Sequence, residues 1–202
     1  MPFTINIFWI NSPTRPLEDW IAELYGPDAS LGPERMDFLK AAHGKRPAAA
    51  HWNDAYWIFD RKRAVQWATS DPAPRGKTLS AYLDPARNRY GYTAREDGEI
   101  IAARHGKGKR FDVIRSATDW GYEHRMVSDH YWKGAPPGAT DIIKSGGILP
   151  KAPPEKFRQG VVLTALQTYT GPDPFGDDRR HFQGVPVRRI SRPRGWRFWQ
   201  QV

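Results

Sequence analysis

The sequence predicts an α+β fold in which short helices come first and a mainly antiparallel sheet follows. Helical patterns concentrate before residue 70, and strand patterns dominate after residue 88. A regular alternation of strand and helix, which is typical of parallel sheets, does not occur in these patterns. The chain has 202 residues, of which 39% are hydrophobic, so it is long enough to bury a core in one large domain or two small ones.

The first 70 residues predict two strands and three short helices. Residues 4–10 are β-branched and aromatic, as in a strand. Apolar residues at positions i, i+3, i+4 and i+7 predict an amphipathic helix over 16–26, and a second helix is expected over 33–44. Residues 51–59 predict another strand, and Asp60 is expected to cap a helix that continues to Ala68.

Residues 89–115 predict a β-meander. The strands 89–95 and 99–104 flank Asp97-Gly98, which supplies the positive φ that a two-residue hairpin turn requires. Residues 106–109 are expected to form a second turn, which leads into a third strand over 110–115. This turn is rich in glycine and lysine, so its amides and charges could hold a phosphate group, although a plain turn between two strands also explains it.

The C-terminal half predicts shorter elements separated by proline- and glycine-rich loops. In order, these are a strand over 122–132, a helix over 140–145, a buried strand over 161–166, a loop over 171–178 and a last strand over 185–190. A soft domain boundary is expected near residues 118–124, which divides an N-terminal region, 1–120, from a C-terminal region, 121–202. A single domain is the alternative.

Composition excludes several classes of function. The chain has no cysteine, which excludes disulfides, thiolate metal sites and cysteine nucleophiles. The six histidines lack the spacing of a metal site, so no metal is expected. No apolar run approaches the roughly 20 residues of a membrane span, and the start resembles no signal peptide. We therefore expect a cytoplasmic protein with no membrane partner.

The positive charge lies entirely in the second half of the chain. Residues 1–102 contain 13 basic and 13 acidic side chains, whereas residues 103–202 contain 18 basic and 9 acidic ones. This asymmetry favours an anionic partner for the C-terminal half, such as nucleic acid, a phosphorylated cofactor or an acidic protein face. A generally basic surface is the alternative.

The order of motifs from residue 128 to residue 166 resembles a known family. A strand that ends in His130-Tyr131-Trp132 is followed by the helix over 140–145, then by Gly-Gly-Ile-Leu-Pro at 146–150 and Gly-Val-Val-Leu-Thr at 160–164. This order is similar to that of small ADP-ribosyltransferases of the His-Tyr-acidic clade, a family that includes toxin domains and DNA-modifying members. Two departures are Trp132, where a threonine is common, and the lack of any glutamate after Glu155.

The resemblance implies a small split-sheet core in the C-terminal half that consumes NAD+. His130 would bond the ribose, Tyr131 and Thr164 would complete the cofactor site, and Tyr169 would stack on nicotinamide. The acidic residue would be Asp177, Asp178 or Asp173. Cleavage of the glycosidic bond passes through an oxocarbenium-like state, which a nearby carboxylate stabilises.

The C-terminal tail combines arginines with aromatic rings. The residues are Arg188, Arg189, Arg192, Arg194, Trp196, Arg197, Phe198 and Trp199. Arginines bind phosphates and aromatic rings stack on unpaired bases, so the tail predicts contact with DNA or RNA. Docking of a last strand by these rings is the alternative.

Three functions follow from these patterns. The first is an NAD+-consuming, ADP-ribosyltransferase-like protein that modifies an anionic target, nucleic acid or protein. The second is a non-enzymatic nucleic-acid-binding or protein-interaction protein, with an origin in a phage or mobile element. The third is a metal-independent nuclease. Whether the chain is an enzyme, and its oligomeric state, stay open at this point.

Overall fold

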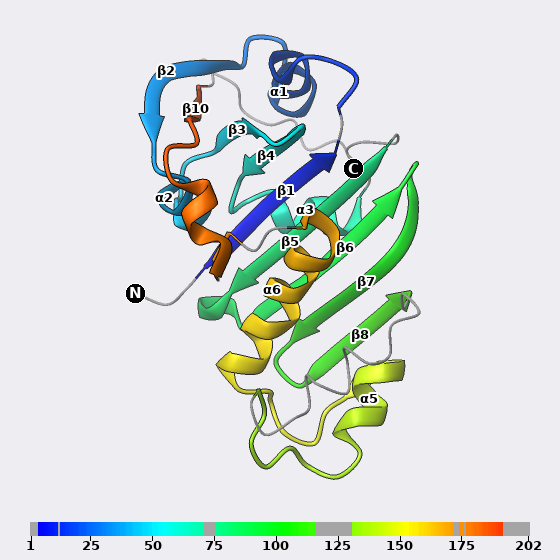
Figure 1. Ribbon diagram of the computed structural model, residues 1–202. Helices are drawn as coiled ribbons and strands as arrows, with labels where there is room; N and C mark the ends of the chain where they lie inside the picture. The colour runs from blue at the N-terminus through cyan, green and yellow to red at the C-terminus, as the bar shows by residue number, and fades with distance from the viewer. Residues whose placement is uncertain are drawn as a thin grey trace.

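The computed structural model describes residues 4–11, 13–70, 76–115, 131–171, 174–175 and 177–191. Within them, ten strands form one sheet in the order β2-β10-β3-β4-β1-β5-β6-β7-β8-β9, and every neighbouring pair is antiparallel (Figure 1). The strands are β1 (Ile5–Asn11), β2 (Ser30–Met36), β3 (Ala48–Trp52), β4 (Ala55–Phe59), β5 (Lys77–Asp84), β6 (Arg89–Glu96), β7 (Glu99–Lys107), β8 (Arg110–Arg115), β9 (Gly147–Ile148) and β10 (Val187–Ser191).

Helices cover parts of both faces of this sheet. They are α1 (Leu17–Tyr25), α2 (Phe38–His43), α3 (Ala64–Thr69), α5 (Ala139–Ser145) and α6 (Glu155–Thr170), with short 3-10 helices η1 (Pro85–Arg87) and η2 (Asp177–Phe182). The first face, to which Ile7 and Leu79 contribute, packs against α2, α5, α6 and η2. The second face, to which Phe8 and Ile10 contribute, packs against α1 and Trp67 of α3.

The central strand β1 is apolar on both faces because a helix layer lies on each side of it. Ile5, Ile7 and Trp9 join the core of the first face. Phe8 and Ile10 alternate with them and join the core of the second face. Alternate residues of a strand point to opposite faces, so the near-continuous apolar run of the sequence reflects burial on both sides.

The mixed helix-and-strand class and the large antiparallel sheet are confirmed. The predicted first strand, the first helix, the helix after Asp60, the three-strand meander and the helix before Gly146 all form. Asp60 Oδ1 accepts hydrogen bonds from the backbone N–H groups of Lys62 and Arg63, but these residues form a turn. Helix α3 begins at Ala64 with Arg63 at its N-cap, so the prediction that Asp60 caps this helix is wrong. The last predicted strand also forms, as β10.

Several local predictions are wrong. Residues 33–36 belong to β2, so the predicted helix over 33–44 begins only at Phe38, where the side chain of Asp37 accepts hydrogen bonds from two backbone N–H groups. The single strand over 51–59 is a hairpin of β3 and β4, because Asn53 and Asp54 both adopt positive φ. Strand β5 was not predicted.

The predicted buried strand over 161–166 is also wrong, because this segment lies inside the helix α6. Its buried residues recur with helical spacing, starting from Phe157 and continuing through Val161, Val162, Ala165 and Leu166. Helix α6 packs on β5 and β6. The apolar run over 161–166 is therefore part of the buried face of a helix. A run of this length fits a short buried strand equally well, so the sequence pattern does not separate the two.

Strands from both halves of the chain join the same sheet. β10 lies between β2 and β3, and β9 forms the opposite end beside β8. Among the described residues, the separate split-sheet core implied by the family resemblance is therefore not seen. Tyr131 and Trp132 lie in a turn rather than in the predicted strand. The proposed boundary at 118–124 and the rest of that strand lie outside the described residues.

None of the helices in the described part of the chain is both long and apolar enough to cross a membrane.

Candidate functional site

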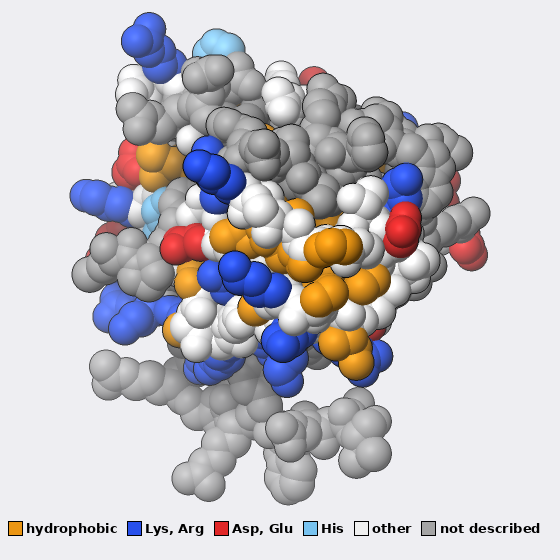
Figure 2. Space-filling model, turned by 90° about the horizontal axis from the view of Figure 1, so that it is seen from below, with side chains coloured by type: hydrophobic (Ala, Val, Ile, Leu, Met, Phe, Trp, Pro, Cys, Tyr) orange, Lys and Arg blue, Asp and Glu red, His pale blue; other side chains and the backbone are white. Residues whose placement is uncertain are grey.

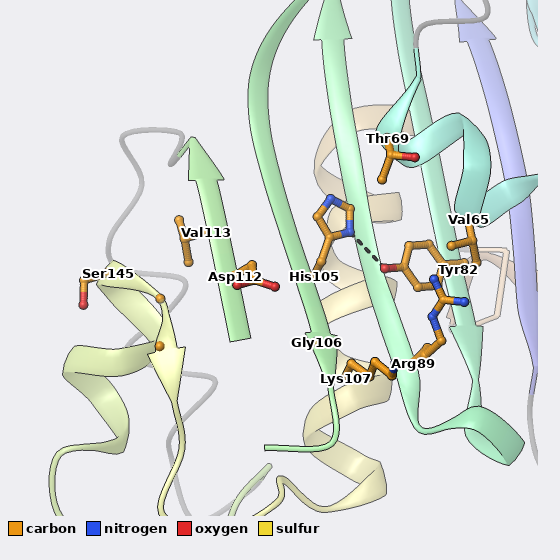
Figure 3. Close-up of a pocket in the computed structure, with 12 residues that line it drawn as sticks. Val65, Thr69, Tyr82, Arg89, His105, Gly106, Lys107, Asp112, Val113 and Ser145 are labelled. Atoms are coloured by element: carbon orange, nitrogen blue, oxygen red, sulfur yellow. Dashed lines mark hydrogen bonds between the residues drawn. The ribbon is translucent and has the colours of Figure 1, made fainter. Parts of the chain in front are cut away.

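A cleft of about 620 Å³ opens on the second face of the sheet, beside α3 (Figure 3). Its walls come from α3, from strands β5 to β8 and from the end of α5. The lining residues are Val65, Thr69, Tyr82, Arg89, His105, Gly106, Lys107, Asp112, Val113, Ser145, Gly146 and Gly147. Clefts of this size are typical of sites for small molecules.

Strand register arranges the polar residues of the cleft in two parallel rows. The row nearer the strand ends consists of directly opposed residues on β5 to β8, namely Asp84, Arg89, Lys107 and Arg110. The next row, two residues along each strand, consists of Tyr82, Gly91, His105 and Asp112. Residues two apart on a strand share a face, so both rows face the same side as α3.

Gly91 allows Tyr82 and His105 to meet, although a whole strand lies between them. These two residues come from β5 and β7, and Gly91 on β6 lies between them in the row. Their rings stack at an interplanar angle of 10°, with centroids 5.8 Å apart. A Cβ atom on Gly91 would lie 2.8 Å from His105 Nδ1 and 2.3 Å from the carbonyl oxygen of Arg104. A side chain at this position would therefore break the contact.

A chain of hydrogen bonds fixes the imidazole of His105. Thr93 Oγ1 donates to the carbonyl oxygen of Ala68 over 2.7 Å. His105 Nε2 lies 3.1 Å from the same Oγ1, and since the hydroxyl proton is used for Ala68, Nε2 must carry a proton and donate it. His105 Nδ1 lies 3.0 Å from Tyr82 Oη, the contact drawn in Figure 3.

Burial keeps this imidazole neutral. Burial, opposed by Asp112 and assisted by the charges of Arg95 and Arg89, lowers the pKa of His105 to about 4. A neutral imidazole with its proton on Nε2 has a free lone pair on Nδ1. Nδ1 therefore accepts the proton of Tyr82. Burial also raises the pKa of Tyr82 to about 12, so the phenol keeps that proton.

Two cations of the outer row have no ion-pair partner among the described residues. Asp84 lies between Arg61, at 3.4 Å, and Arg87, at 3.0 Å. Arg110 pairs with Asp112 at 2.8 Å. For the side chains of Arg89 and Lys107, which lie opposite each other, the described part of the chain provides no carboxylate partner within ion-pair distance.

No family model, curated protein or solved structure matches this chain.

The residues predicted from the family resemblance do not line this cleft. Thr164 and Tyr169 lie on α6, which packs on the opposite face of the sheet. The ring of Tyr169 lies 6.0 Å from that of Tyr92. Burial and the nearby Tyr92, against the opposing charge of Arg104, raise the pKa of Tyr169 to about 12.

The other predicted transferase residues are spread over different parts of the chain. Tyr131 is half-buried and packs against the core of the first face. Asp177 and Asp178 belong to η2, and His130 and Asp173 lie outside the described residues. The transferase activity therefore stays a prediction.

The two described arginines of the predicted nucleic-acid tail are engaged within the protein. Arg188 donates to the carbonyl oxygens of Gly32 and Leu31 on the neighbouring strand β2. Arg189 pairs with Glu34 over 2.7 Å. The remaining predicted residues, Arg192, Arg194, Trp196, Arg197 and Trp199, lie outside the described residues, so nucleic-acid binding by this tail stays a prediction.

Basic side chains also gather at the end of the molecule that is seen from below, where they surround an apolar patch (Figure 2). Ile148, on β9, is 74% exposed. The segment over 131–158 that forms much of this end contains five basic residues and two acidic ones. This segment therefore carries part of the excess of positive charge in the second half of the chain.

In the described part of the chain, no three His, Asp or Glu side chains are grouped closely enough to hold a metal ion. The cleft instead offers two cations, a neutral imidazole and a phenol. The glycine- and lysine-rich turn of the sequence points to Gly106 and Lys107, whereas no sequence motif points to Tyr82, Arg89 or His105. The signal that points to them is the register of the meander, which brings them together from three strands.

Proposed function

We propose that the cleft between α3 and β8 binds a small phosphorylated ligand. The observation that carries this proposal is the pair of opposed cations, Arg89 and Lys107, that line the cleft without an ion-pair partner in the described structure. Directly opposed residues on antiparallel strands have Cβ atoms about 5 Å apart, and like charges at such positions destabilise a sheet. An anionic ligand offsets this repulsion.

Phosphate fits the two side chains better than a carboxylate does. A guanidinium and an ammonium together offer more donors than a carboxylate of two oxygens can use, and a phosphate has three terminal oxygens. Gly106 and Gly147 contribute backbone atoms to the lining. Val65 of α3 adds apolar surface, against which an uncharged part of the ligand can pack. The cleft volume suits a molecule the size of a mononucleotide.

The test is calorimetric titration of the purified full chain with inorganic pyrophosphate and with AMP. Loss of a charge-assisted hydrogen bond weakens binding by roughly tenfold or more, so Arg89→Gln and Lys107→Gln should each reduce the affinity for both ligands to that degree. Lys77→Gln is the matched control, because it removes the same charge from the far end of β5, where Lys77 pairs with Glu96.

The proposal is supported if binding falls in the two cleft variants and persists in the control. It is refuted if neither ligand binds the wild-type protein. It is also refuted if all three variants lose affinity equally, since the effect would then come from net charge alone.

A further inference from the structure

The hydrogen-bond chain across the cleft orients the imidazole of His105. It also determines whether Tyr82 Oη can donate or accept a hydrogen bond from a ligand. We propose that the ligand carries a free hydroxyl group close to its phosphate, and that Tyr82 Oη accepts a hydrogen bond from that hydroxyl. A ribose phosphate, as in a ribonucleotide, has this chemistry. The inference rests on the proposed function, since it concerns the same cleft.

The direction of the chain follows from its fixed end. The carbonyl oxygen of Ala68 can only accept, so Thr93 donates to it. The occupied hydroxyl of Thr93 must then accept from His105 Nε2. Because the ring is neutral, Nδ1 accepts the single proton of Tyr82. Each hydrogen bond determines the donor of the next one. The proton of Tyr82 Oη is therefore donated to His105 and is not available to a ligand.

Tyr82 Oη is thus an acceptor, and it lies in a cleft whose charged groups are donors. The oxygen retains a lone pair that can accept a hydrogen bond. Among the described residues, His105 is its hydrogen-bond partner. A phosphate oxygen is itself an acceptor at this position and would repel it. A hydroxyl group is a donor, so it can fill the position that phosphate cannot.

The spacing of the two rows matches a sugar phosphate. Tyr82 and His105 lie two residues along their strands from the row of Arg89 and Lys107, and two residues of a strand span about 7 Å. A phosphate bound by the outer row therefore places the carbons of an attached sugar over the inner row. The orientation is fixed because cations occupy one row and an acceptor oxygen occupies the other.

The experiment compares two nucleotides that differ only in their hydroxyl groups. AMP and 2′,3′-dideoxy-AMP are titrated against wild-type protein, Tyr82→Phe and Tyr90→Phe. We expect the wild type to prefer AMP by about tenfold, the value of one good hydrogen bond. Tyr82→Phe should abolish the preference and leave the affinity for the dideoxy compound unchanged, which also shows that the cleft has remained intact.

Tyr90→Phe is the matched control. Tyr90 is also a buried tyrosine of the sheet, but it packs against Phe111 and Phe157 on the first face. Its removal should leave the preference for AMP as in the wild type. A loss of preference in both variants would overturn the inference, because a general loosening of the sheet would then explain it.

The outcomes separate the two proposals. Equal binding of AMP and the dideoxy compound to the wild type overturns the hydroxyl inference and leaves phosphate binding standing. A preference that survives in Tyr82→Phe likewise overturns it. Failure of pyrophosphate, AMP and the dideoxy compound alike to bind overturns both proposals.

Discussion

Protonation of His105 should make the stability of the protein depend on pH in a defined window. The imidazole has an ordinary pKa of about 6.5 in an unfolded chain, and burial lowers the pKa to about 4 in the folded protein. Between these values the unfolded chain binds a proton that the folded protein does not. Stability is therefore lost as pH falls from about 6.5 to about 4, and the full loss is about 3 kcal/mol.

The assay compares wild type with His105→Gln by urea denaturation at pH 7 and pH 4. All other titrating groups are common to both proteins, so their contributions cancel in the difference of unfolding free energies. At pH 7 we expect the wild type to be the more stable, because it keeps the hydrogen bonds to Tyr82 and Thr93. At pH 4 the difference should have moved by about 3 kcal/mol in favour of the variant.

A difference that is the same at both pH values refutes the reasoning, since His105 would then take up its proton equally in both states. His51→Gln, which replaces an exposed histidine on β3, controls for the loss of one imidazole from the chain. The slope of the urea transition must also match between variants, because a change in slope reports a change in the unfolded or folded ensemble.

Further predictions concern stability and activity. Gly91→Ala should lower the free energy of unfolding in urea by about 1–3 kcal/mol, because the new Cβ would lie 2.3 Å from the Arg104 carbonyl oxygen at a φ of +153°; unchanged stability would contradict this. Arg89→Gln should raise stability by about 0.2–1 kcal/mol without ligand, since it relieves like-charge repulsion; a lower thermal midpoint would argue against it. Asp37→Ala should cost about 1 kcal/mol in urea, because its side chain accepts two backbone hydrogen bonds at the start of α2; a smaller loss in a Ser variant is the control. If the family resemblance is functional, the protein releases nicotinamide from NAD+ and His130→Ala abolishes that release; no release from the wild type would end this hypothesis.

The elements that the sequence predicts best are those with local signals. Both residues of the Asp97-Gly98 turn adopt positive φ. A two-residue hairpin turn requires this backbone conformation, so the dipeptide alone predicts the β6–β7 hairpin. By contrast, Val161–Leu166 carries an apolar run that fits a strand and a helix alike. The segment is helical because the residues before it, such as Phe157, extend the apolar face with helical spacing beyond the length of the apolar run.

The candidate site depends on a feature that a turn motif does not encode. Counting pairs outward from the Asp97-Gly98 turn would place Gly91 opposite Arg104. A bulge between Ala94 and Arg95 and their partners shifts the register, so Gly91 pairs with His105 instead. A shift of one residue exchanges the two faces of a strand, and it therefore decides whether His105 or Arg104 faces the cleft. The position of such a bulge cannot be predicted from the sequence pattern.

The position of the cleft follows from the length of α3. Ser80, Thr93 and Arg95 on the second face bond backbone carbonyl groups of this helix and hold it on β5 and β6. The helix has only six residues, about 9 Å at 1.5 Å per residue, so it covers one end of these strands. The rows of Tyr82 and Arg89 lie beyond it on the same face. A longer helix would bury the cations of the outer row at a large desolvation cost. The short helix instead leaves this polar face of the sheet open to the proposed anionic ligand.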